Sequence, residues 1–409
     1  MVPNGWREGR VRDLIKSLNA GVSVNSEDDG NLSSSYKILK TSCVSKGIFD
    51  PNKTKSVVED VEISRLKEPV LCDSIIISRM NTPALVGANG YIENGIENTY
   101  LPDRLWQAKP KSNDVNMKWL GYWFASSHTR YTLSSTATGT SGSMKNITKS
   151  DVLNIKIDIP PLPEQRKIAT ILGTWDKAIS TTERLIDNSK QQKKALMQQL
   201  LTGKKRLLDD SGKPFEGEWE EVKLSKVAEI VMGSSPKSSS YNESSEGLPL
   251  IQGNADIKNR KSAPRIYTSE VTKKCSVGDI LLSVRAPVGT IAKSEHVACI
   301  GRGISAVRAK KHHVQEYLYQ WLLWFEPRWE KYSQGSTFEA VNSNDIKSLH
   351  LIVPTYTEQA KIASVLSNAD QEIELLEQQL ADLKQEKKAL MQQLLTGKRR
   401  VIVDEKDVA

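Results

Sequence analysis

Carboxylate, lysine and histidine side chains are the groups with which this chain could carry out catalysis, and their spacing argues against it. A nuclease clusters carboxylates and a lysine around a divalent ion, because hard oxygen ligands hold magnesium. The nearest fragments of that kind are Asp103, and Glu221 with Lys223, which belong to different halves of the chain. The five histidines show no spacing typical of a metal site or a catalytic triad. We therefore expect neither a metal centre nor a triad.

Cofactor-binding motifs are also missing from the sequence. There is no Gly-x-x-x-x-Gly-Lys-Ser/Thr phosphate loop, and the Gly-Arg-Gly string at 301–303 is too short for a dinucleotide fingerprint. The string at 158–162 lacks both the adjacency and the aromatic residue of a DNA amino-methyltransferase motif. We expect no cofactor to be bound by this chain, so that binding is the chemistry that remains.

Short basic, polar and turn-rich segments are the candidate contacts for a nucleic acid. Arg, Lys, Asn and Gln can read base edges, whereas Ser, Lys and backbone amides mainly hold phosphates. For any one of these residues, an ordinary solvated charge is the alternative interpretation. The candidates are Lys46, Lys53, Lys55, Arg79 and Asn81 in the first half, and Lys237, Ser238, Lys258, Asn259, Arg260, Lys261, Arg285 and Arg302 in the second half.

The overall composition permits such a partner. The chain has 409 residues, enough for two or three domains, and its net charge of +8 with a pI near 9.0 suits a polyanion. The four cysteines are scattered and form no Cys-x-x-Cys pair, which indicates reduced thiols. No apolar run is long enough to cross a membrane. We expect a cytoplasmic protein.

A duplicated segment must position these candidates. Residues 164–206 recur without a gap at 358–400, a constant offset of 194 (358 − 164). Apolar residues recur at alternating steps of three and four, which predicts an a/d seam on a long helix. Each helix should span about 38 residues, or roughly 57 Å. The predicted seam residues are Ile168, Leu172, Ile179, Ile186, Leu196 and Leu200, and Ile362, Leu366, Ile373, Leu380, Leu390 and Leu394.

Weaker repeats extend upstream of each helix. Trp6 is echoed by Trp219, and Arg79 and Arg285 follow similar strand-like runs. Each half therefore reads as a mixed α/β domain followed by a helix, giving an α+β fold with an internal pseudo-two-fold repeat. Matched register favours pairing of the two helices over each lying on its own domain. The expected segments are 1–158 and 217–352 for the domains, 159–203 and 353–397 for the helices, 204–216 for a connector and 398–409 for a tail.

These motifs resemble the specificity subunit of type I restriction-modification enzymes. The matching strings are Ile-Pro-Pro-Leu-Pro-Glu-Gln at 159–165 and Lys-Ala-Leu-Met-Gln-Gln-Leu-Leu-Thr-Gly-Lys at 194–204, with counterparts at 354–361 and 388–398. The openings at 217–224 and 278–283 are typical of a target-recognition domain in that family. The resemblance extends over nearly the whole chain.

The resemblance implies a division of labour. Each variable domain would bind one half of a bipartite target in double-stranded DNA, and the long helices would pack antiparallel as a spacer. The chain would do no catalysis itself. Two modification (methyltransferase) subunits carrying S-adenosylmethionine would dock on it, and restriction (translocase/endonuclease) subunits, which use ATP and magnesium, would join them. Two other hypotheses are a self-sufficient DNA-modifying enzyme and a non-catalytic coiled-coil adaptor.

The two copies also differ at their starts. Leu-Pro at 162–163 becomes Tyr-Thr at 356–357, so the docking surfaces around the two helix starts need not be equivalent. Lys193 lies on the seam, and its counterpart is Lys387. A polar residue at such a position can set the register of a coiled coil.

Overall fold

The computed structural model describes residues 2–28, 34–45, 47–141, 143–329 and 340–403. These fall into two compact units, the first formed by Met1–Thr181 with Leu380–Ala409 and the second by Thr182–Gln379. Both long helices, α5 (Leu162–Leu200) and α10 (Tyr356–Leu394), contribute residues to both units. This division differs from the segments expected from the sequence, because each helix is shared between the two cores.

Unit 1 is built around an antiparallel sheet of order β2-β9-β5-β7. Its central strand β5 is wholly buried, as its apolar run Ser-Ile-Ile-Ile-Ser predicts. The strands of unit 1 are β1 (Arg7–Arg10), β2 (Ile15–Ala20), β3 (Lys37–Leu39), β4 (Thr54–Ser56), β5 (Ser74–Ser78), β6 (Met80–Asn81), β7 (Asn89–Ile92), β8 (Thr99–Tyr100), β9 (Leu105–Pro110), β10 (Thr138–Ser141), β11 (Met144–Asn146) and β12 (Lys156–Ile159). Its short helices are α1 (Asp60–Arg65), α2 (Met117–Ala125), α3 (Ser127–Thr136) and α4 (Lys149–Leu153).

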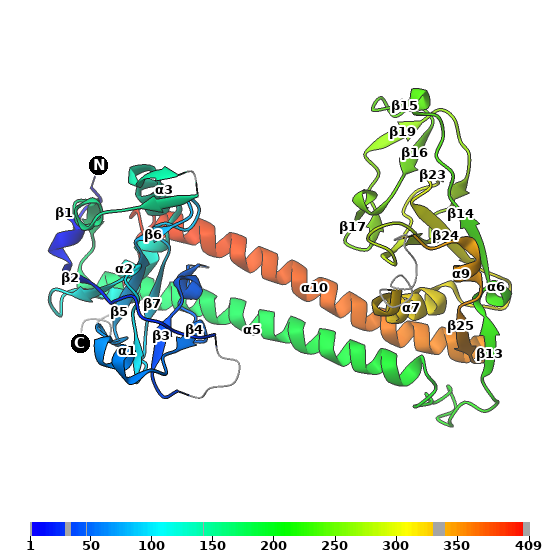
Figure 1. Cartoon of the computed structure of the whole chain (residues 1–409), viewed down its shortest axis with the longest axis horizontal. Helices are drawn as coiled ribbons and strands as arrows, with labels where there is room; N and C mark the ends of the chain where they lie inside the picture. The colour runs from blue at the N-terminus through cyan, green and yellow to red at the C-terminus, as the bar shows by residue number, and fades with distance from the viewer. Residues whose placement is uncertain (1, 29–33, 46, 142, 330–339, 404–409) are drawn as a thin grey trace. The chain divides into compact units, whose positions relative to one another are not determined.

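Unit 2 has a six-stranded sheet of order β14-β24-β21-β22-β18-β17 and a five-stranded sheet of order β15-β19-β16-β23-β20. Its strands are β13 (Glu220–Lys223), β14 (Ala228–Met232), β15 (Tyr241–Asn242), β16 (Leu248–Ile251), β17 (Ile257–Lys258), β18 (Lys261–Ser262), β19 (Ile266–Thr268), β20 (Lys274–Cys275), β21 (Ile280–Ser283), β22 (Ile291–Lys293), β23 (Ala298–Ile300), β24 (Ile304–Ala309) and β25 (His350–Val353). Its short helices are α6 (Leu224–Val227), α7 (Gln315–Phe325) and α9 (Ser343–Lys347). Within unit 2, α7 lies along α10 and the five-stranded sheet projects away from that helix (Figure 1).

The long helices begin three residues after, and end three residues before, the bounds of the predicted segments 159–203 and 353–397. Proline lies in the first turn of α5, where its missing N–H costs no helical hydrogen bond. Gly203 and Gly397, which follow the two helices, adopt left-handed φ angles of +69° and +65°. Across these glycines Lys205 N–H donates to the Gln199 carbonyl, and Arg399 N–H donates to the Gln393 carbonyl, both at 3.2 Å.

An antiparallel strand pair precedes each long helix. In unit 1, β1 pairs with β12, and in unit 2, β13 pairs with β25. The strand-like runs that precede Arg79 and Arg285 form the buried strands β5 and β21. Among the described helices, none has an apolar run that could cross a membrane.

Candidate nucleic-acid interface

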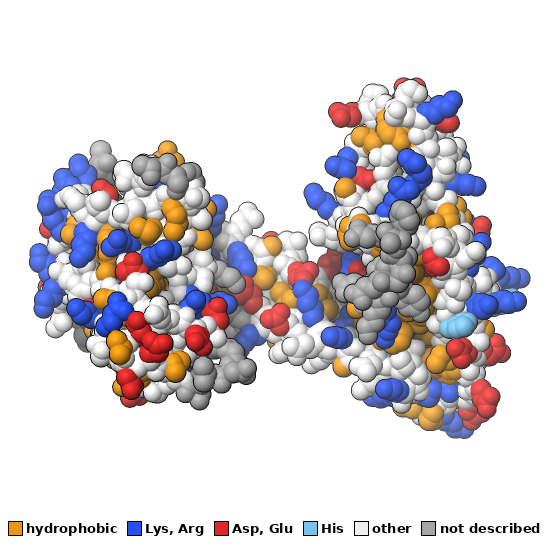
Figure 2. Space-filling view, in the orientation of Figure 1, with side chains coloured by type: hydrophobic (Ala, Val, Ile, Leu, Met, Phe, Trp, Pro, Cys, Tyr) orange, Lys and Arg blue, Asp and Glu red, His pale blue; other side chains and the backbone are white. Residues whose placement is uncertain are grey.

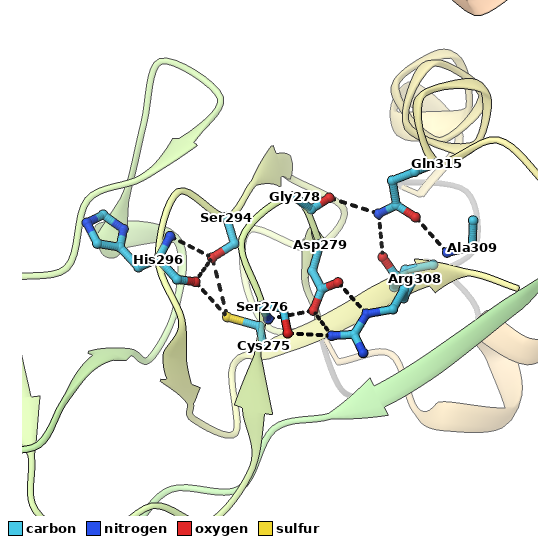
Figure 3. Close-up of polar contacts among 10 residues, drawn as sticks. Cys275, Ser276, Gly278, Asp279, Ser294, His296, Arg308, Ala309 and Gln315 are labelled. Carbon is cyan, nitrogen blue, oxygen red and sulfur yellow. Dashed lines mark hydrogen bonds and ion pairs between the residues drawn. The ribbon is translucent and has the colours of Figure 1, made fainter. Parts of the chain in front are cut away.

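A cysteine, a serine and a histidine lie close together in unit 2, but they do not form a nucleophilic site. Burial raises the pKa of the Cys275 thiol, so the thiol is protonated at neutral pH. Its sulfur lies 3.4 Å from Ser294 Oγ, and the contact with His296 is to the backbone carbonyl. In Figure 3 the His296 ring points away from the thiol. No described group of His, Cys, Asp and Glu could hold a metal ion.

The other polar contacts in Figure 3 hold a turn in place. Arg308 donates from Nε and Nη2 to the two oxygens of Asp279, each at 2.7 Å, and from Nη2 to Ser276 Oγ at 2.9 Å. Gln315, the first residue of α7, donates to the Gly278 carbonyl and accepts from Ala309 N–H. This network fixes the entry to the buried strand β21.

A tight turn at 301–303 joins β23 to β24 and carries Arg302. The Arg302 side chain is exposed, and no described residue bonds its guanidinium. The turn backbone is held on two sides: Arg302 N–H donates to Ser235 Oγ at 3.1 Å, and Gly303 N–H donates to the Gln252 carbonyl at 3.1 Å. Within the described part of the chain, Arg302 is therefore an unpaired cation on a fixed backbone.

Glycines allow the segments around this turn to approach closely. A Cβ on Gly233 would lie 2.1 Å from the Gly301 carbonyl oxygen, and one on Gly303 would lie 2.3 Å from the Gln252 carbonyl oxygen. Only a residue without a side chain fits such an approach. The glycines thus bring the loop at 233–241 against the turn at 301–303.

We call the residues of this loop and turn, together with Gln252, the unit 2 tip. It brings together three of the sequence-predicted contacts, Lys237, Ser238 and Arg302. Gln252 Nε2 donates to Tyr241 Oη at 2.8 Å, and Tyr241 in turn donates to the Pro236 carbonyl at 3.2 Å. Guanidinium, amide and phenol groups of this kind recognise base edges, whereas Lys and Ser hold phosphates.

Two of the other predicted cations of unit 2, Arg260 and Lys261, have acidic partners. Lys258, Asn259, Arg260 and Lys261 form the β17–β18 hairpin. Arg260 pairs with Glu326 at 2.5 Å, and Lys261 pairs with Glu295 at 3.1 Å. The hydrogen bond that Lys261 donates to Glu295, and then the charge of Glu295, raise the pKa of Lys261.

This hairpin borders a cleft of about 1080 Å³ whose α10 side carries Asp370, Glu374 and Glu377. Arg260 and Lys261 are therefore paired with carboxylates within the molecule. On the visible face of each unit, Lys and Arg side chains are spread among acidic and neutral ones (Figure 2).

In unit 1 the predicted contacts lie in separate places. Lys46 is outside the described residues. Lys53 precedes β4, which contains Lys55, and Lys55 lies 4.0 Å from Asp28. Arg79 precedes β6, and its guanidinium lies 5.9 Å from the Trp106 ring with a buried, unpartnered Nε. Asn81 bonds the Ser78 hydroxyl and its own neighbour's N–H.

The expected equivalence of Arg79 and Arg285 is wrong, because Arg79 corresponds to the residue directly before Arg285. The Arg79 carbonyl accepts from Ile147 N–H, and in unit 2 the Val284 carbonyl accepts from Val341 N–H. Val284, which is buried, therefore occupies the place of Arg79. Because successive side chains point to opposite faces of an extended chain, Arg79 is turned inward and Arg285 is exposed.

The counterpart of the 301–303 turn in unit 1 is the turn at 102–104. It carries Arg104, a candidate contact that was not predicted from the sequence. Leu105 N–H donates to the Pro102 carbonyl, as Ile304 N–H donates to the Gly301 carbonyl. Arg104 is exposed, and no described residue bonds its guanidinium. The signal available in the sequence was a Pro-Asp-Arg turn directly before a strand.

A buried glutamate anchors the start of each long helix, and sequence reasoning missed it although both glutamates begin the repeat. In unit 1, Arg400 donates from Nε and Nη2 to Glu164 at 2.7 and 2.8 Å, and Trp6 Nε1 donates to the same carboxylate at 2.9 Å. In unit 2, Arg206 makes both bonds to Glu358 at 2.7 Å. Trp219 lies near Arg206, but its buried Nε1 has no partner among the described residues.

The residue after each glutamate is a buried glutamine, which binds the start of a short helix in the same unit: α2 in unit 1 and α7 in unit 2. Gln165 Oε1 accepts from the Asn116 backbone N–H at 2.9 Å, and Gln359 Oε1 accepts from the Val314 backbone N–H at 3.0 Å. Asn116 and Val314 are the N-cap residues that directly precede α2 and α7. We call the glutamate and glutamine contacts the frame contacts.

All of the predicted seam residues are buried or half-buried. Ion pairs join the two helices within each unit, and in unit 2 the residue numbers rise along α5 as those of their partners fall along α10. In unit 2, Lys193 pairs with Asp370 and Lys190 with Glu377, whereas in unit 1, Lys387 pairs with Asp176. Buried are Ile168, Leu172, Ile186, Leu200, Ile362, Leu366 and Leu394; half-buried are Ile179, Leu196, Ile373, Leu380 and Leu390.

Comparison with known proteins gives a consistent result. Residues 3–189 and 216–385 match the family described as type I restriction modification DNA specificity domain. A putative type I restriction enzyme specificity subunit of Methanocaldococcus jannaschii is 30% identical over 412 aligned residues, covering 98% of this chain and 95% of the relative.

Solved structures are similar over the same length. A chain from a study of complex assembly and conformational transition of the type I R-M system matches with a TM-score of 0.61 at 25% identity, covering 98% of this chain and 100% of that one. The type I restriction-modification S subunit of M. genitalium matches with a TM-score of 0.62 at 15% identity, covering 97% and 99%, which supports the fold alone.

Proposed function

The chain belongs to the type I restriction-modification DNA specificity family, and from that premise we propose that each of its units reads one half of a bipartite DNA target. Its function is DNA sequence recognition within a type I restriction-modification complex. The observation that carries the proposal is the doubling of the unit. The family match covers both halves, and the frame contacts occur once in each.

The unit 2 tip and its counterpart in unit 1, the turn at 102–104, which we call the unit 1 tip, are the proposed base-reading surfaces. Arg302 in unit 2 and Arg104 in unit 1 are exposed arginines on equivalent turns, and an arginine can donate two parallel hydrogen bonds to guanine in the major groove. Lys237 and Ser238 next to Arg302 would hold phosphates. The segments of α5 and α10 form an antiparallel coiled coil in this proposal, and its length sets the gap between the half-sites.

The chemistry would reside in partner subunits. We propose that two modification subunits with S-adenosylmethionine dock on this chain, and that restriction subunits requiring ATP and magnesium join them. The chain would itself bind no cofactor. Because its DNA partner lies there, the proposed location is the cytoplasm.

Mapping of methylated bases in cells tests this function. Cells that express the chain with its modification subunits should carry a methylated bipartite motif, because the recognition units direct the methyltransferase. Cells with the modification subunits alone serve as the control and should lack that motif. Replacing residues 1–150 with the first domain of another family member should change one half-site and leave the other as it was.

Two results would contradict the proposal. One is a methylation pattern that does not depend on the chain. The other is a replacement of residues 1–150 that alters both half-sites together, since each unit is proposed to read independently.

A further inference from the structure

Two aspartates, Asp176 of α5 and Asp370 of α10, occupy the same place in the repeat, 194 residues apart (370 − 176). In unit 1, Asp176 Oδ1 pairs with Lys387 of α10 at 2.5 Å, and Asp176 Oδ2 accepts from the Tyr122 hydroxyl of α2 at 2.6 Å. One carboxylate thus joins three elements: both long helices and the helix of the recognition domain.

Unit 2 repeats this arrangement with a different donor. Asp370 Oδ1 pairs with Lys193 of α5 at 2.5 Å, and Asp370 Oδ2 accepts from Gln320 Nε2 of α7 at 2.8 Å. The lysine side chains are only 16% and 11% exposed, so water screens these pairs less than surface pairs. We call each of these three-way contacts a junction.

The donors are suited to a permanent contact. Burial, and then the hydrogen bond to Asp176, raise the pKa of Tyr122, so its hydroxyl keeps the proton that it donates. The Lys387 ammonium lies 5.1 Å from the centre of the Tyr122 ring. Gln320 is fully buried. Charge-assisted hydrogen bonds are about twice as strong as neutral ones.

We propose that Asp176 and Asp370 are positioning residues that fix the angle of each recognition domain on the long helices and thereby discriminate between targets with different gaps. The inference rests on the proposed function, because a gap exists only if both units read DNA. A gap one base pair longer or shorter rotates one half-site by roughly 35° relative to the other. A domain with a fixed angle cannot follow that rotation, whereas a loosened domain can.

The test uses the full chain in complex with its modification subunits and DNA targets whose gap is native or changed by one base pair. The measured quantity is the ratio of affinities for the native and altered gaps. Tyr122→Phe removes only the hydrogen bond from the Tyr122 hydroxyl to Asp176 in the unit 1 junction. Gln320→Met removes the hydrogen bond from Gln320 to Asp370 in the unit 2 junction. Each should lower this ratio about tenfold, because a hydrogen bond to a charged group is lost. Asp176→Asn should lower it further.

Lys190→Met is the matched control. Lys190 also pairs across the helices, with Glu377 at 2.6 Å, but no described bond links either residue to a recognition domain. This variant should leave the ratio within twofold of the wild-type value. The preferred bases in both half-sites should be unchanged in every variant.

Two outcomes would overturn the inference. One is a ratio that stays within twofold in both Tyr122→Phe and Gln320→Met. The other is an equal loss of affinity for all gaps, which would indicate a merely structural role. Failure of the proposed function looks different, because the wild-type complex itself would then show no bipartite preference.

Discussion

Unit 1 and unit 2 agree closely in their frame contacts and differ in their tips. At the helix starts, glutamate, glutamine and arginine recur with bond lengths that agree to about 0.1 Å. At the tips, the turn has the sequence Pro-Asp-Arg in unit 1 and Gly-Arg-Gly in unit 2, so the arginine is shifted by one position within the turn. The two units thus share the residues that hold the domains, and they differ in the residues proposed to contact DNA.

The frame contacts are nevertheless not identical, and this gives the largest expected effect. Arg206→Ala should cost about 3–5 kcal/mol of the unfolding free energy of unit 2, because it leaves Glu358 buried without a positive partner. Arg400→Ala should cost about 1 kcal/mol less in unit 1, since Trp6 still donates to Glu164. Hydrogen exchange of amides in each unit of the full chain measures both values.

Lys361→Ala is the control for this pair of variants. Lys361 forms an exposed ion pair with Asp210 in unit 2, and its loss should change stability by less than about 1 kcal/mol. Equal losses in Arg206→Ala and Arg400→Ala would show that the Trp6 bond contributes nothing.

The second-largest expected effect is on the stability of unit 2 and comes from the turn at the unit 2 tip. Gly303→Ala should destabilise unit 2 by about 3 kcal/mol, because the new Cβ would lie 2.3 Å from a backbone oxygen that cannot rotate away. Gly253→Ala is the matched control, since a Cβ there meets nothing within 4 Å. Chemical denaturation compares the two, and similar midpoints would contradict the close approach.

Removing the tip arginines tests how far the units have diverged. Arg302→Ala should relax base preference at one position of one half-site, with a loss of about 1–3 kcal/mol of discrimination. Arg104→Ala should do the same in the other half-site only. Methylation mapping with each variant distinguishes this result from a uniform loss of binding, which would make both arginines phosphate contacts.

The smallest effect separates two sets of predicted cations within unit 2. Lys261→Ala should leave DNA affinity and its salt dependence unchanged, because Lys261 already pairs with Glu295. Lys237→Ala should reduce the slope of log affinity against log salt by about 0.9, the contribution of one phosphate contact. Titrations of the complex at several salt concentrations measure both slopes. A reduced slope for Lys261→Ala would instead show that the β17–β18 hairpin contacts DNA phosphates.

The long helices and the strand-like runs could be predicted because their signals are local. Seam residues such as Ile168 and Ile362 repeat at helical spacing, and Gly203 and Gly397 end the helices as expected. The run at β5 is apolar enough to indicate a buried strand on its own.

The contacts of individual cations could not be predicted, because they depend on residues distant in the chain. Whether Lys261 is free or paired is decided by Glu295, and the exposure of Arg302 by the glycines at 233 and 303. Arg79 was matched to Arg285 because the strands before them differ in length by one residue, which only the backbone hydrogen bonds reveal.

The glutamines of the frame contacts have an evolutionary consequence. Gln165 and Gln359 bind backbone N–H groups, belonging to Asn116 in one unit and Val314 in the other. Every amino acid except proline carries that donor. A foreign domain can therefore be inserted by recombination without inheriting a matching side chain at this position. A lineage can acquire new targets in single genetic exchanges while the helices to which each domain attaches stay the same.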